Sequence, residues 1–193
     1  MVFDELELVV AARKGDQAAF SALVRHHGPR LGRLARAMVG EASADDVVQE
    51  TVLAAWKAMS TFRGEARFGT WIQTICYRQG LRESRRGQSL RSLIDPLAEA
   101  DRQWADEHWS VDPAQVAARA GQHRALDAAI EVLPPMYRTA LVLHDVDGLA
   151  AGEVAAITGV ALATAKTRIR RARMALVSEL ARRGQDAGKE AAS

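Results

Sequence analysis

The sequence predicts an all-α protein made of two small helical domains joined by a flexible acidic linker. Apolar residues recur at intervals of three or four along most of the chain, which is the period of an amphipathic helix. Acidic residues and prolines interrupt this pattern near the middle, and two short helical patterns meet at a glycine near the end. We therefore expect a first domain over residues 1–90, a linker over 91–115, a second domain over 116–183 and a disordered tail over 184–193.

Composition limits the classes of function. A net charge of +2 does not by itself indicate nucleic acid, but the charges are segregated along the chain, and the local field matters more than the total. The single cysteine, Cys76, excludes an internal disulfide, and its apolar helical surroundings favour a core role over a redox or metal role. The five histidines form no HExxH motif, so we expect no metal and no cofactor. Without about 18 consecutive apolar residues, the protein is expected to be cytoplasmic.

The first domain is expected to begin with two helices. Residues 4–13 have apolar positions at helical spacing and form a short amphipathic helix. Asp16 can cap the next helix, because its carboxylate can accept hydrogen bonds from the first free backbone N–H groups. Gly28 and Pro29 are expected to interrupt this second helix, which then resumes as far as Gly40.

A third helix combines an apolar face with an acidic end. Ser43 is a plausible cap for it, and acidic residues that follow the cap favour the positive end of the helix dipole. Val47, Val52 and Trp56 lie at helical spacing on its buried side. The polar positions that collect at its exposed end are Asp45, Asp46, Gln49 and Glu50.

A charged, glycine-rich loop and a basic helix follow. Between residues 67 and 91 there are six arginines and one acidic residue, with Phe68, Trp71 and Tyr77 interleaved. Basic side chains neutralise phosphates and aromatic rings stack on unpaired bases, so this segment predicts binding to single-stranded nucleic acid. Phe68 and Trp71 fall on the apolar side of the helix and are expected in the core rather than on bases.

The middle of the chain reads as a linker. Its acidic residues separate two basic regions, and Pro96 and Pro113 break helix continuity. Trp104 and Trp109 are unusual in a solvated tether. They indicate docking either on the protein's own domains or on a partner.

The second domain is expected to begin with two helices. Residues 116–133 form the first, which Pro134 and Pro135 end, and residues 136–144 form the second. A turn at residues 147–148 leads into the last motif.

The last motif consists of two helices that meet at Gly159, where a left-handed turn can end the first helix. Val154 and Ile157 face the core from the first helix. The second helix has a buried stripe of Ala165, Ile169, Ala172, Leu176 and Leu180. Its opposite surface carries Lys166, Arg168, Arg170, Arg171 and Arg173. This is the geometry that places a recognition helix in the DNA major groove. The alternative is a solvated basic helix in a bundle.

Together, these segments resemble a known family. The blocks DDVVQETVLAAWKAMSTFRGEARFGTWI, LPPMYRTALVLHDVDGLAAGEVAAITGV and TAKTRIRRAR are similar to those of bacterial sigma-70 factors of the extracytoplasmic-function (ECF) type. Such factors keep only the domains called sigma-2 and sigma-4. The resemblance covers residues 20–180, nearly the whole chain.

The resemblance implies three sets of functional residues. A set that docks on the clamp helices of the largest polymerase subunit comprises Asp45, Asp46, Val48, Gln49 and Glu50. A set that melts the −10 promoter element and holds its non-template strand comprises Arg63, Arg67, Tyr77, Arg78, Arg82, Arg85 and Arg86. A set that reads the −35 element comprises Thr164, Lys166, Thr167, Arg168, Arg170, Arg171 and Arg173.

The resemblance also implies partners. They are core RNA polymerase, including the flap of its second subunit, promoter DNA, and an anti-sigma factor that is often membrane-bound. It implies neither enzyme activity nor a small-molecule substrate. Arg78 departs from the family, which often has asparagine there, and this bears on the −10 sequence that is read. Two other interpretations remain, a conventional helix-turn-helix repressor or activator and a helical adaptor that binds only protein.

Overall fold

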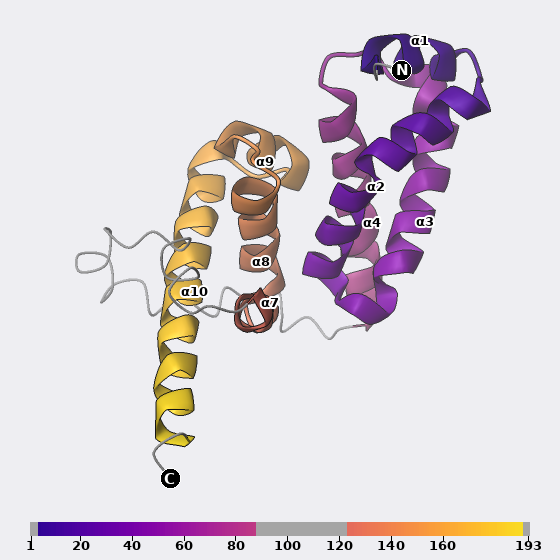
Figure 1. The fold of residues 1–193 in the computed structure, drawn as a ribbon. Coiled ribbons are helices and arrows are strands. Elements are labelled where there is room, and N and C mark those ends of the chain that lie inside the picture. Colours follow the sequence, from indigo (N-terminus) through magenta and orange to yellow (C-terminus); the bar gives the residue numbers. More distant parts are fainter. Residues whose placement is uncertain (1–3, 88–122, 191–193) are drawn as a thin grey trace.

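The computed structural model describes residues 4–87 and 123–190, and these residues form helices and no strand (Figure 1). We refer to residues 4–87 as the first unit and to residues 123–190 as the second unit. The expected linker, with Trp104 and Trp109, lies outside the described residues. The all-α prediction is confirmed.

The first unit contains four α-helices and one short 3-10 turn. The helices are α1 (Glu5–Arg13), α2 (Gln17–Val39), α3 (Glu41–Ala58) and α4 (Phe68–Gly87), and the turn is η1 (Met59–Thr61). Helices α2, α3 and α4 pack on one another, and α1 lies across one end of them (Figure 1). Asp16 caps α2 as expected, since its Oδ1 atom accepts hydrogen bonds from the backbone N–H groups of Ala18 and Ala19 at 2.8 and 3.0 Å.

Two local predictions in this unit are wrong. Pro29 does not interrupt α2, which is continuous. A proline inside a helix removes one backbone hydrogen bond, but buried residues on both sides of it, such as Leu23 and Leu31, anchor the two halves in the same core. Ser43 is not a cap, because α3 begins two residues earlier with Gly40 at the N-cap position.

The second unit contains four α-helices and one π-helical turn. The helices are α7 (His123–Glu131), α8 (Pro135–Leu141), α9 (Ala151–Thr158) and α10 (Leu162–Glu190), and the turn is η3 (Val142–Val146). The start of the helix expected over residues 116–133 lies outside the described residues.

Helix α10 extends beyond the expected end of the second domain. It continues through residues 184–190 of the expected tail and ends at Glu190, while residues 191–193 lie outside the described part. The segment contains Ala, Gln, Lys and Glu, which favour helix, and extending an existing helix avoids the cost of nucleation.

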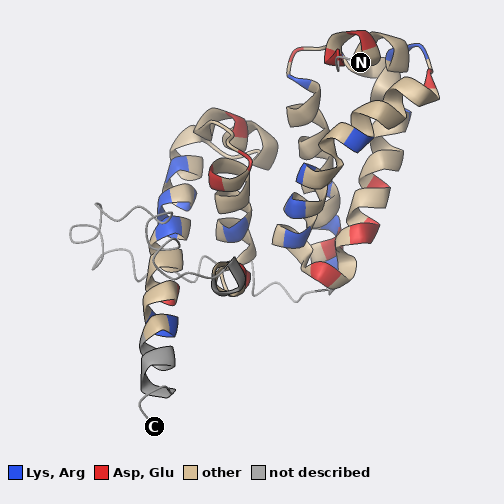
Figure 2. Cartoon of the chain, viewed as in Figure 1, with Lys and Arg blue, Asp and Glu red and all other residues tan. Residues whose placement is uncertain are grey.

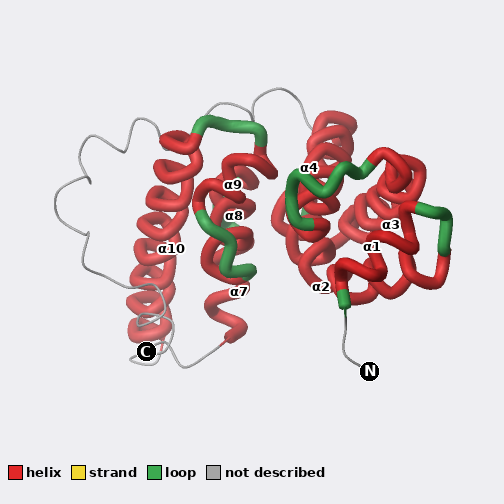
Figure 3. Tube along the Cα trace, turned by 90° about the horizontal axis from the view of Figure 1, so that it is seen from above, coloured by secondary structure: helices red, strands yellow, loops and turns green. Residues whose placement is uncertain are grey.

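One apolar core extends across both units. A cluster of buried residues includes Leu23, Leu34 and Ile72 of the first unit together with Leu143 and Ile157 of the second. Helix α8 packs against α2, and α9 packs against α4, as the view from above shows (Figure 3). A smaller cluster lies within the second unit, where α7, α8 and α10 meet. The two units therefore touch, an arrangement that the sequence did not indicate.

Cys76 belongs to the larger core, as predicted. Its side chain is 0% exposed, and its Sγ atom lies 3.8 Å from the backbone oxygen of Leu31. Burial raises the pKa of this thiol to about 11, because the thiolate would lose its hydration. The thiol is therefore protonated and shielded in the folded protein.

Candidate polymerase and nucleic-acid interfaces

Helix α3 presents an acidic surface to solvent. Asp45, Asp46, Gln49 and Glu50 are all exposed, and we call these four residues the acidic surface. Val48 lies beside them, half-buried against the core, while Val47 on the inner side is buried. Figure 2 shows acidic residues gathered toward the end of α3 that lies away from α1. This surface can attract a basic partner without any rearrangement of the first unit.

Helix α4 carries a row of arginines. Arg67, just before the helix, and Arg78, Arg82 and Arg85 are exposed, and each is separated from the next by close to a whole number of helical turns, so they share one side of the helix. We call these four residues the arginine face. Two further arginines of the sequence prediction are exposed but are paired locally: Arg86 with Glu83 at 3.5 Å, and Arg63 with Glu65 at 3.8 Å.

An aromatic layer supports the start of α4. The rings of Phe62 and Trp71 have centroids 4.8 Å apart, and Phe68 lies 5.5 Å from Trp71. Phe68 is 2% exposed, which confirms its expected core position, whereas Trp71 is half-buried. Trp71 follows Arg67 by one helical turn, so part of its ring lies beside the arginine face. Tyr77 is half-buried against the core and lies off that face.

The last two helices form the predicted helix-turn-helix. Gly159 has a φ of 68°, in the left-handed region, and so reverses the chain between α9 and α10 where a residue with a side chain would be strained. All five residues of the predicted stripe of α10 are buried. Thr164 and Lys166 are exposed at the start of the helix, and Thr167 and Arg168 are half-exposed. The basic surface therefore begins in the first turns of α10.

Two of the predicted DNA-binding arginines are tied to other helices. Arg173 makes a forked ion pair with Asp145, with Nε donating to Oδ1 at 3.2 Å and to Oδ2 at 3.0 Å. Arg171 donates through Nη1 to the hydroxyl of Tyr137 at 3.4 Å. These contacts hold α10 against α8 and η3. Sequence spacing could not reveal them, because the partners lie 28 and 34 residues away.

A buried carboxylate joins the two units. The side chain of Asp147 is 0% exposed, and its Oδ1 atom accepts hydrogen bonds from Nε and Nη2 of Arg33 at 2.9 and 2.6 Å. Gln73 of α4 donates to Oδ2 of the same carboxylate at 3.3 Å. Sequence reasoning predicted only a turn at this aspartate. The three residues come from α2, α4 and the loop after η3, so the contact exists only while the units touch.

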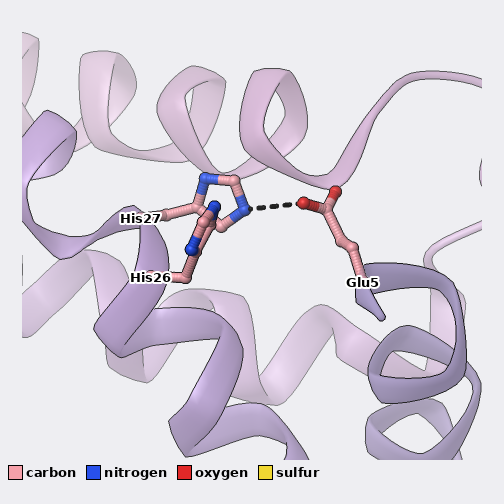
Figure 4. A group of neighbouring side chains, drawn as sticks. All are labelled: Glu5, His26 and His27. Carbon is pink, nitrogen blue, oxygen red and sulfur yellow. Dashed lines mark hydrogen bonds and ion pairs between the residues drawn. The ribbon is translucent and has the colours of Figure 1, made fainter. Parts of the chain in front are cut away.

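A histidine pair and a glutamate join α1 to α2 (Figure 4). Nε2 of His27 lies 3.2 Å from Oε2 of Glu5, and the rings of His26 and His27 are 4.9 Å apart and nearly perpendicular. Burial lowers the pKa of His27 and outweighs the opposing effect of the Glu5 carboxylate. Sequence reasoning found no role for these residues, because Glu5 is 22 positions away from His27.

The combination of surfaces defines a class. An acidic docking surface, an arginine face beside aromatic rings and a separate helix-turn-helix are the parts of a DNA-binding protein that works with a second macromolecule. Comparison with known proteins gives the family. Residues 23–90 match the family described as Sigma-70 region 2, and residues 123–176 match Sigma-70, region 4.

Individual relatives agree with this result. The chain is 31% identical over 176 residues to the ECF RNA polymerase sigma-E factor of Salmonella typhimurium, covering 88% of this chain and 90% of that protein. The chain therefore belongs to the ECF sigma factors of the sigma-70 family, which are transcription initiation factors. It directs transcription to promoters.

Two solved structures are similar. One is CnrH in complex with the cytosolic domain of CnrY, with a TM-score of 0.63 and 29% identity over 92% of this chain and 96% of that one. The other is the sigma factor RpoE in complex with the anti-sigma factor NepR from Bartonella quintana, with a TM-score of 0.57 and 24% identity over 83% of this chain and 96% of that one. The second likeness concerns the fold alone.

Membrane insertion is not supported by the helices described. Within residues 4–87 and 123–190, none combines the length and the apolar composition needed to cross a bilayer.

Proposed function

We propose that the acidic surface of α3, together with Val48, binds the clamp helices of the largest subunit of core RNA polymerase, and that the second unit meets the flap of the second subunit. The exposure of Asp45, Asp46 and Glu50 beside an apolar residue supports this assignment. Opposite charge steers two proteins together, and the apolar residue adds contact area once they meet. The protein itself performs no catalysis and binds no small-molecule substrate, and it acts in the cytoplasm, where the polymerase is.

The arginine face of α4 holds the non-template strand of the −10 element. Arginines on one side of a helix can follow a phosphate backbone, and the half-buried Trp71 offers a ring edge beside them for an unstacked base. Arg63 and Arg86 contribute to the local positive field rather than to the row itself. Tyr77, which lies off the face, supports α4 from the side.

The first turns of α10 read the −35 element in the major groove. Thr164, Lys166, Thr167 and Arg168 stand at the N-terminal end of the recognition helix, which is the part that reaches base edges in helix-turn-helix proteins. Arg170 and Arg171 serve phosphates, and Arg173 orients the helix through Asp145.

Use of both elements requires the two units to separate. The −35 and −10 elements are about 25 base pairs apart, or about 85 Å of B-DNA at about 34 Å per turn. Helix α9 adjoins α10 and packs against α4, so the two DNA-binding surfaces are far closer than that in this structure. The contact through Asp147 would therefore be broken in the promoter complex. This supports weak promoter binding by the isolated chain.

An anti-sigma factor is the expected regulator, and in the family such factors are often membrane-bound. The resemblance of the sequence supports this partner, and CnrH, which is 29% identical to this chain, is itself seen in a complex with the cytosolic domain of CnrY. The linker would thread toward the active-site channel of the polymerase.

The proposal assigns polymerase binding to α3 and promoter recognition to α10, and these two roles can be tested separately. Purified protein, core RNA polymerase and fragmented genomic DNA of the source organism should yield new transcripts whose start sites share an upstream and a downstream element. Charge reversal of Asp45 and Asp46 should abolish polymerase binding, while Lys166→Ala should weaken promoter use and spare polymerase binding. If no start site depends on the protein and it binds a duplex operator tightly without polymerase, it is a conventional repressor or activator.

A further inference from the structure

We propose that Glu5, His26 and His27 bind a divalent metal ion of the zinc class. One donor atom from each side chain lies within 4.8 Å of the others, and the three residues come from two helices that pack together (Figure 4). None of the three residues belongs to the acidic surface, the arginine face or the helix-turn-helix. The site is therefore separate from the surfaces of the function proposed above.

The donor set matches the chemistry of zinc. Two imidazole nitrogens and one carboxylate oxygen are the protein ligands of open zinc sites, in which water takes a further position. The same nitrogen-rich set also accepts cobalt and nickel, whereas magnesium and calcium prefer oxygen ligands. Donors at about 2.1 Å from a tetrahedral ion are about 3.4 Å apart, so the nitrogen of His27 and the oxygen of Glu5, at 3.2 Å, are already close to the required separation, and His26 has to move by about 1 Å or more.

Two of the three donors are already held in place. The ring of His27 is 5% exposed and lies 5.4 Å from the ring of Phe68. A Cβ atom at Gly69 would come within 2.9 Å of its Cε1 atom, so the absence of a side chain there makes room for the imidazole. Glu5 stands in the first turn of α1, where Asp4 caps the helix. The metal would replace the proton between His27 and Glu5.

His26 provides the movement that the site needs. Its side chain is exposed, and its ring stands at 85° to that of His27, so rotation about its own side-chain bonds can bring a nitrogen to the ion. An exposed ligand above a buried one also leaves a path by which the ion enters from solvent. The site therefore combines two ligands that are held in place, His27 and Glu5, with one ligand, His26, that can adjust its position.

A simpler role for the group is a structural tether. The hydrogen bond between His27 and Glu5 joins α1 to α2 whether or not a metal is present. The two roles differ in what they require of His26. The hydrogen bond of the tether joins His27 to Glu5 and does not pass through His26, whereas the metal site loses one of its three protein ligands when His26 is removed.

Cobalt and zinc titrations of the full-length, chelator-treated protein test the proposal. We expect one Co²⁺ to bind per chain and to give the visible absorption bands of a four- or five-coordinate ion. Added Zn²⁺ should displace the cobalt and so remove these bands. Zn²⁺ should also raise the melting temperature of the protein. H26A should weaken metal affinity by at least about a hundred-fold, because the loss of even an outer-shell partner of a metal ligand costs about ten- to a hundred-fold and His26 is a direct ligand. The rise in melting temperature that Zn²⁺ produces, measured for each protein against its own metal-free state, should be much smaller in H26A than in the wild type.

Two further variants complete the test. E5Q keeps an oxygen that can accept a hydrogen bond from His27 but removes the anionic ligand, so it should retain the metal-free stability and lose affinity as H26A does. H108A removes a histidine outside the described residues and should bind as the wild type does. Absence of the cobalt bands, or zinc stabilisation that persists in both H26A and E5Q, would overturn the proposal.

Hydrogen exchange gives an independent measurement. Because His27 packs against Phe68 and Gly69, a bound ion should also slow amide exchange in the first turn of α4. We expect this change with Zn²⁺ in the wild type and not in H26A. Equal protection in both proteins would show that the ion binds elsewhere.

Discussion

The arginines of α4 and those of α10 differ in which parts of the molecule they contact. On α4, the partners of Arg82 and Arg86 are residues of the same helix, Gln79 and Glu83, about one turn away. On α10, Arg171 and Arg173 contact residues of α8 and η3. One surface is thus a row of charge on a single helix, whereas the arginines of the other also pack their helix against the rest of its domain, in addition to the DNA contact that we propose for them. Substitutions of arginines on the two helices should therefore have different effects on DNA binding and on folding stability.

The largest effect is expected on the arginine face. R78A/R82A should reduce promoter opening by about a hundred-fold, because each lost phosphate contact weakens strand capture and lowers the salt dependence. Permanganate reactivity of unpaired thymines at the −10 element measures opening. The matched control is R86A, which removes an exposed arginine of the same helix that is already paired with Glu83. An equal loss in R86A would mean that total charge, not the row, is what matters.

The contact that joins the two units should rank second. D147A leaves Arg33 without its buried carboxylate, and since the Arg33 side chain is 37% exposed, solvent limits the expected loss to about 1–2 kcal/mol of folding stability. Chemical denaturation measures this loss, and small-angle scattering should show a larger average size. The control is R36A. Because Arg36 pairs with the well-exposed Glu41, this substitution should change neither the folding stability nor the average size. An unchanged size in D147A would mean that the apolar contact alone holds the units together.

Two basic residues of α10, Lys166 and Arg173, should differ in whether their substitution also lowers the stability of the protein. K166A should weaken −35 binding about five-fold or more with no change in melting temperature, as expected for an exposed residue that contacts DNA. R173A should lower both DNA affinity and stability, the latter by about 0.5–1 kcal/mol, because it also breaks the pair with Asp145. Titration of a −35 duplex into the polymerase complex and thermal denaturation measure the two quantities. Identical stability of the two variants would remove the distinction between contact and packing.

The smallest effect concerns the far end of α10. Hydrogen bonds from Arg182 and Arg183, with some opposition from desolvation, lower the pKa of Glu179 to about 2. A lowered pKa in the folded state stabilises the protein above the ordinary carboxyl pKa, and this stabilisation is lost as the pH falls toward 2. E179Q should therefore unfold with less pH dependence between about pH 4 and pH 2 than the wild type. If the folding stability of the two proteins changed with pH in the same way over this range, this explanation would be wrong.

Sequence patterns predicted the features that depend on nearby residues. The buried stripe of α10, the left-handed Gly159 and the cap at Asp16 all follow from spacing within one or two turns, and the structure confirms them. The acidic exposure of α3 was predicted for the same reason, because four polar residues share its outer end.

Features that depend on distant residues were missed. Pro29 looked like a helix break because the local cost is visible in the sequence, while the core on both sides of it is not. Arg33, Gln73 and Asp147 are spread over more than a hundred positions, and their meeting depends on how the two units pack. The same limit applies to Glu5 and His27, which belong to different helices.

The burial of Cys76 gives the molecule a built-in reporter. It is the sole thiol in the sequence, and it lies at the centre of the core with no exposed surface. A thiol reagent can therefore label the native chain only during an opening of the first unit, so the labelling rate counts such openings without any engineered probe. Labelling of Cys76 in the protein alone and in its complex with polymerase would show whether partner binding makes openings of this core rarer or more frequent.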